Sequence, residues 1–75
     1  MTAVHRELPN GYTVSVINHG YGSNNGLLEM ACWETVSGEW AMDRPPFVNN
    51  DVLGWLSPEE VSANTDEIAN WPAIS

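Results

Sequence analysis

The chain has 75 residues and carries ten acidic residues but only two basic ones, Arg6 and Arg44, so its formal net charge is −8. A chain without lysine cannot neutralise many phosphates, which argues against nucleic acid and anionic membranes as direct partners. The same imbalance favours a protein partner with a basic surface. The length allows one domain, over residues 1–75, and the apolar content of 43%, with four tryptophans, is too high for a disordered acidic segment.

Cysteine content and the N-terminal sequence predict a cytoplasmic protein. Cys32 is the one cysteine, so an intramolecular disulfide is excluded, and its apolar neighbours predict a buried side chain without the cation or base that activates a thiol. The N-terminal residues lack the apolar core of a signal peptide, and no apolar run reaches the length of a membrane span. If the chain is phage-encoded, we expect it in the cytoplasm of the host.

The first two thirds of the chain have the pattern of an antiparallel meander. Residues 1–8 are expected to form a flexible arm, and Pro9–Gly11 a turn. Alternating side chains and short connections then predict three strands, at residues 12–17, 26–35 and 39–43. The Gly- and Asn-rich residues 19–26 match no phosphate-binding pattern and are expected to form a long hairpin loop. Beyond the two prolines that follow Arg44, residues 47–50 are either irregular or a short edge strand.

A helix is predicted from Pro58 to Asn70. Ser57 is a good N-cap, Pro58 suits the first helical position, and Glu60 at the third completes a capping box. Pro72 prevents a much longer helix. Val61 and Ile68 fall on one side and would face the sheet. The predicted fold class is therefore α+β, with a three- to four-stranded antiparallel sheet and one C-terminal helix packed on one face.

The predicted helix has an acidic face on the side away from Val61 and Ile68. Four carboxylates fall within about 120° of one another on the helix wheel: Glu59, Glu60, Asp66 and Glu67. The first two suit a helix N-terminus, whereas the last two lie near the negative end, where acids are unfavourable. Such a face is either a solvated surface or one that binds basic residues of a partner.

Trp33 is the aromatic candidate for partner binding. It shares a strand face with Glu29, which predicts a position on the solvent side of the sheet or at the edge of the core. The other three tryptophans are expected in the core of so small a domain: Trp40, Trp55 and Trp71.

Two stretches carry a resemblance to known sequences, Leu8–Val16 (LPNGYTVSV) and Trp55–Val61 (WLSPEEV). They resemble uncharacterised phage, prophage and actinobacterial open reading frame products of similar size and acidity. The resemblance implies a small accessory protein, of a kind that often inhibits a host protein by imitating the charge spacing of nucleic acid. It brings no catalytic motif.

No pattern in the chain predicts catalysis, a cofactor or a metal site. His5, His19 and Cys32 have no zinc spacing, and no nucleophile is paired with a base. We therefore expect no enzyme but a protein, monomeric or homodimeric, that binds a basic protein through Glu59, Glu60, Asp66, Glu67 and Trp33. The alternative is a structural or assembly protein that forms homo-oligomers through sheet edges or apolar surface.

Overall fold

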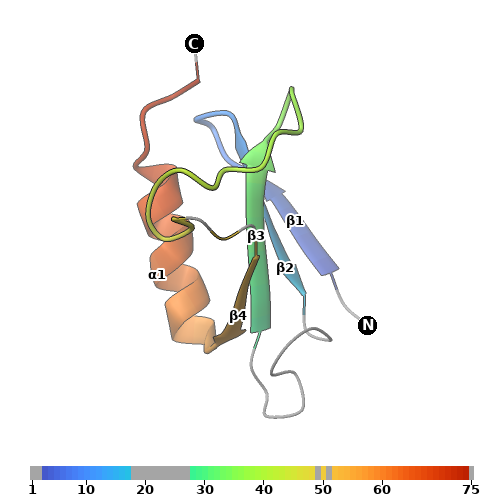
Figure 1. Cartoon of the computed structure of the whole chain (residues 1–75), viewed down its shortest axis with the longest axis vertical. Coiled ribbons are helices and arrows are strands. Elements are labelled where there is room, and N and C mark those ends of the chain that lie inside the picture. Colours follow the sequence, from blue (N-terminus) through green and yellow to red (C-terminus); the bar gives the residue numbers. More distant parts are fainter. Residues whose placement is uncertain (1–2, 18–27, 49, 51, 75) are drawn as a thin grey trace.

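Four strands form one antiparallel sheet in chain order, and a helix packs against one of its faces (Figure 1). The computed structural model describes residues 3–17, 28–48, 50 and 52–74. Its elements are β1 (Ala3–Glu7), β2 (Tyr12–Ile17), β3 (Leu28–Glu34), β4 (Val52–Leu56) and α1 (Pro58–Ala69). The α+β meander with a C-terminal helix, predicted from the sequence, is confirmed. The predicted hairpin loop at residues 19–26 lies outside the described residues.

The expectation of a flexible arm over residues 1–8 is wrong for residues 3–7, which form strand β1. Ala3–Glu7 pairs along its whole length with β2, with Val4 opposite Val16 and Arg6 opposite Val14. The strand contains three consecutive polar residues, His5, Arg6 and Glu7. An edge strand tolerates such residues, because one of its sides faces solvent and charges there hinder pairing with other chains.

The predicted third strand at residues 39–43 is also wrong. In that segment only Trp40 forms an isolated bridge, to Trp33, and the strand beside β3 is β4. Residues 47–50 belong to no strand where the structure describes them. The pairing of β4 shifts between Leu28–Leu56 and Met30–Leu53, so β4 contains an extra residue. Trp55 lies in this bulge with a φ of 63°.

The core lies between the sheet and α1. Alternate residues of β2 and β3, including Val14, Met30 and Cys32, are buried there together with Ile68 of α1, and the loop before β4 adds Phe47. Alternation along the strands therefore predicts the core face of the sheet correctly.

Two of the three tryptophans expected in the core are exposed. Trp40 is 51% exposed and Trp55 is 58% exposed, whereas Trp71 packs against the core as expected. Phe47 and Ala41 enter the core from an irregular loop, where no periodicity marks inward-facing positions.

Helix α1 begins as predicted. The Ser57 hydroxyl accepts a hydrogen bond from the Glu60 backbone N–H at 3.2 Å, and a Glu60 carboxylate oxygen accepts one from the Ser57 N–H at 3.0 Å. Both bonds satisfy amides that the first helical turn leaves unpaired. The helix ends at Ala69, with Asn70 as its C-cap, so the predicted boundary is correct to within one residue.

Candidate functional site

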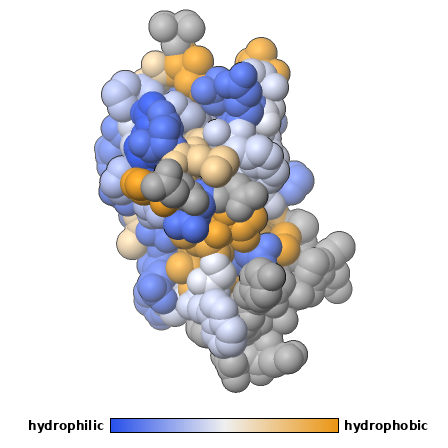
Figure 2. Space-filling view, viewed as in Figure 1, coloured by the Kyte–Doolittle hydropathy of each residue, from blue (hydrophilic) through white to orange (hydrophobic). Residues whose placement is uncertain are grey.

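The four predicted acidic residues of α1 are all exposed: Glu59, Glu60, Asp66 and Glu67. The left edge of the molecule in Figure 2, where α1 lies, is mostly hydrophilic. The last turn of α1 contains no basic residue, and the one ion pair found among the described residues joins Asp43 to Arg44. The charge of this acidic face is therefore not neutralised by an ion pair within the described part of the chain.

The four acids are not equivalent. Glu60 caps the helix, and Glu59 lies in the first turn, where a negative charge is favourable. Asp66 and Glu67 lie toward the C-terminal end of the helix, where the dipole disfavours them. Their position has no such stabilising role, which makes them the stronger candidates for binding.

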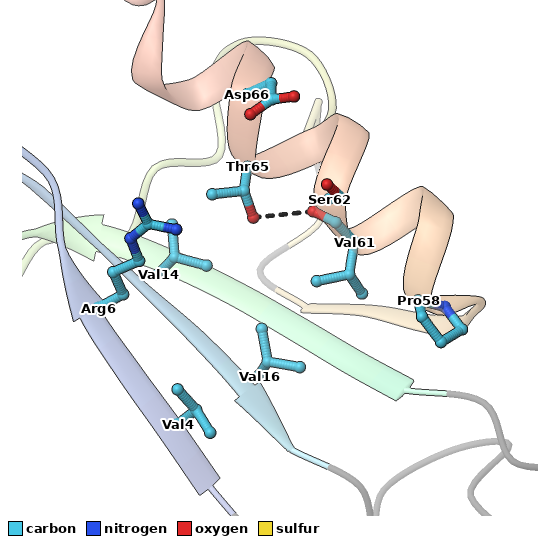
Figure 3. A pocket seen from close by; sticks show the side chains of 9 residues that line it. All are labelled: Val4, Arg6, Val14, Val16, Pro58, Val61, Ser62, Thr65 and Asp66. Atoms are coloured by element: carbon cyan, nitrogen blue, oxygen red, sulfur yellow. Dashed lines mark hydrogen bonds between the residues drawn. The ribbon is translucent and has the colours of Figure 1, made fainter.

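Asp66 also borders a groove of about 310 Å³ between α1 and the first two strands (Figure 3). Valines of the strands form its floor, Pro58 and Val61 line its helical side, and Arg6 projects from β1 on the side facing Asp66. Arg6 faces the helix because it alternates with His5 along β1. One of the two cations of the chain therefore lies on the Asp66 side of the acidic face, whereas Glu67 does not line this groove.

The second cation, Arg44, is held by contacts within the fold. Its guanidinium lies 5.0 Å from the ring centre of Trp71 and 6.0 Å from that of Tyr12, and its Nε is 3.5 Å from a carboxylate oxygen of Asp43. These cation–π and ionic contacts attach the loop before β4 to the end of the chain. Within the described part of the chain, Arg44 forms no ion pair with the acids of α1.

Trp33 lies on the opposite side of the sheet from α1. Its neighbour Cys32 is buried in the core, and successive side chains of a strand alternate between faces. The five predicted site residues therefore do not form one surface, because the four acids lie on the helix and Trp33 lies on the face that α1 leaves uncovered.

Two residues that the sequence analysis did not select lie beside Trp33. The ring of His5 is 5.3 Å from it and that of Trp40 is 5.5 Å from it, centre to centre, both in edge-to-face contact. His5 was missed because no strand was predicted at residues 3–7. The prediction of Trp40 in the core is wrong, because its bridge opposite Trp33 places it on the same face of the sheet as Trp33.

Cys32 is only 1% exposed, and burial raises the pKa of its thiol from the ordinary 9.0 to about 11. A thiol with such a pKa is neutral at physiological pH and is a poor nucleophile. Within the described ranges, the His, Cys, Asp and Glu side chains form no group of three that could hold a metal ion. Nor does that part of the chain contain a helix with the length and apolarity to cross a membrane.

Comparisons with known proteins add no relative: no family model, curated protein or solved structure matches this chain. The resemblance to phage and actinobacterial products stays a prediction.

Proposed function

We propose that this protein binds another protein that has a basic surface, and that the acidic face of α1 makes the contact. The interaction is electrostatic, and one form of it is inhibition of a nucleic-acid-binding protein of the host by imitation of phosphate charges. The proposal assigns binding and not catalysis. It includes a cytoplasmic location, which the single cysteine supports.

One observation carries the proposal: Asp66 and Glu67 are exposed near the negative end of α1, and the last turn provides no base to balance them. Acids at this end cost stability, by a few tenths of a kcal/mol each at the surface. A partner that supplies arginine or lysine reverses this cost, because opposite charges attract where like charges and the helix dipole repel.

A pull-down from bacterial lysate tests the proposal with a variant that removes only these two charges. We expect the tagged parent to retain a basic protein at low salt and the variant Asp66→Asn/Glu67→Gln to lose it. Loss of binding through unfolding is not expected, since neutralising acids at this helix end favours the fold. Circular dichroism checks that the variant is folded.

The matched control removes two acids that lie outside α1, Glu34→Gln and Asp43→Asn. It has the same net charge as the α1 variant, so a general effect of charge weakens both equally. If the control loses the partner and the α1 variant keeps it, the acidic face of α1 is not the contact surface.

Self-assembly is the second candidate function, and the edge of the sheet favours it. Among the strands that the structure describes, β1 is at one edge and has only β2 beside it, and its Val4 is 56% exposed. Pairing of β1 with a second copy would extend the sheet and cover this apolar side chain. Sedimentation at low and high salt distinguishes the two candidates, because association through backbone pairing and apolar contact is nearly independent of salt.

A further inference from the structure

We propose that the face of the sheet opposite α1 is a second interface, and that it binds a segment of another protein that carries arginine or lysine. We call this face the open face and define it by His5, Trp33 and Trp40, with Glu7 and Glu39 at its borders. The inference goes beyond the contact proposed for α1 and can fail independently of it.

The aromatic side chains of the open face form one connected group across three strands. His5 is on β1 and Trp33 on β3, strands that lie about 10 Å apart with β2 between them. Their rings still meet at 5.3 Å, because β2 contributes only small side chains, Thr13 opposite Trp33 and Ser15 opposite His5. The hydroxyls of Thr13 and Thr35 are joined by a hydrogen bond of 2.7 Å. The Thr13 hydroxyl therefore has a hydrogen-bond partner although the residue is buried. The group is thus held by the fold and needs little rearrangement to bind a ligand.

Trp40 extends this group into solvent. It is 51% exposed although it contacts Trp33, and both are tryptophans, the residue type most enriched among the anchors of protein interfaces. Leaving half of so large a ring in water forgoes hydrophobic stabilisation that a bound partner would recover. The exposed part of the group is therefore suited to an aromatic contact with a partner.

Charge determines the kind of partner. Glu7 lies in the same cross-strand row as Thr13 and Trp33, and Glu39 precedes Trp40. Arg6 lies in the groove beside α1. Arg44 lines a hollow with Glu39 and Trp40, but its guanidinium is held against Trp71. An aromatic surface bordered by acids, whose one nearby cation is already held by Trp71 and Asp43, favours guanidinium or ammonium groups, which stack on tryptophan and pair with carboxylates.

A second copy of the chain is a poor occupant by the same argument. Two open faces in contact would bring the glutamates of one chain toward those of the other, in molecules that each carry a net charge of −8. The open face and the acidic face of α1 are also separated by the thickness of the molecule, whose smaller dimensions are 21 and 20 Å. Since the screening length at physiological salt is about 8 Å, the two faces act separately.

The test uses a synthetic peptide of three Arg–Gly repeats as the probe, and a Gln–Gly peptide of equal length as the uncharged control. Binding is followed by NMR through the indole N–H signals of the four tryptophans. We expect the arginine peptide to shift the signals of Trp33 and Trp40 more than those of Trp55 and Trp71. Trp40→Ala should weaken binding at this site about fivefold. Trp55→Ala removes a similarly exposed tryptophan from β4 and should leave it unchanged.

The α1 variant Asp66→Asn/Glu67→Gln separates this inference from the proposed function. If the indole shifts persist in that variant, the open face binds independently of α1. If the shifts are absent in the parent, or if Trp40→Ala and Trp55→Ala weaken binding equally, the inference is wrong whatever the pull-down shows. Sedimentation that finds a dimer which Trp40→Ala dissociates would also overturn it, because the occupant would then be a second copy.

Discussion

At the scale of single residues, Trp55 combines a bulky side chain with a backbone conformation that favours glycine. Its φ of 63° lies in the left-handed region, which costs a non-glycine residue about 1–2 kcal/mol. Trp55 adopts this conformation in the bulge of β4, whereas the preceding residue, Gly54, does not have a positive φ. The structure therefore predicts stored strain at an exposed tryptophan.

A comparison of Trp55→Gly with Trp55→Ala measures that strain, because both variants lose the same ring. We expect the glycine variant to have the larger free energy of unfolding in urea, by about 1 kcal/mol. Ala31→Gly is the control in β3, where the backbone has no positive φ and glycine should be less stable by about 0.5–1 kcal/mol. Equal stability of the two Trp55 variants would show that the position is not strained.

Cys32 supplies a prediction on pH. Its thiol should resist iodoacetamide at pH 8 in the native protein and react readily in urea, because only unfolding exposes it and restores its ordinary pKa. Since the folded pKa is raised, the contribution of the thiol to stability is complete below pH 9 and is lost as the pH rises toward about 11. Rapid alkylation of the native protein at pH 8 would contradict the assigned burial.

A variant without the thiol is the control for the predicted loss of stability at high pH. Cys32→Ala lacks the thiol, so its free energy of unfolding should fall less between pH 9 and 11 than that of the parent. Parallel curves for the two proteins would mean that the thiol ionises equally in both states.

At the scale of elements, the capping box makes the start of α1 the best-determined boundary. Ser57→Ala removes the acceptor for the Glu60 N–H and should lower the free energy of unfolding by about 1 kcal/mol, measured in urea. Ser62→Ala, at an exposed interior position of the same helix, should be neutral or slightly stabilising. If both variants behave alike, the cap does not stabilise the helix in solution.

The elements that the sequence predicts correctly are those with a local physical signal. The capping box marks α1, and strict alternation marks β2 and the core side of β3. Strand β1 gives no such signal, because an edge strand with His5, Arg6 and Glu7 is defined by its pairing with β2. Strand β4 likewise depends on β3, and its Gly54 and bulge hide the alternation.

The candidate site was predictable in part. The exposure of the acids on α1 follows from helical periodicity alone. The separation of Trp33 from those acids follows from alternation only once the helix is assigned to the Cys32 face. The contact of Trp33 with His5 depends on the pairing of three strands and could not be derived from local patterns.

At the scale of the whole molecule, the excess of acidic residues is distributed over two surfaces. Arg44 is held by Trp71 and Asp43, in a hollow that it lines with Trp40 at the edge of the open face. Arg6 lies in the groove between α1 and β1 and borders the acidic face of α1. The molecule therefore presents acidic surfaces on two opposite sides, one helical and one aromatic. This arrangement supports the proposal that the protein binds basic partners.

The most direct test of this account is the salt dependence of binding to the basic protein retained in the pull-down. We expect the association constant of the parent to fall at least about tenfold between 0.05 and 0.5 M salt, as ionic attraction is screened. The variant Asp66→Asn/Glu67→Gln should bind more weakly and with a shallower dependence on salt. An association constant that is unaffected by salt, or equal slopes for parent and variant, would contradict the claim that the acidic face of α1 makes the contact.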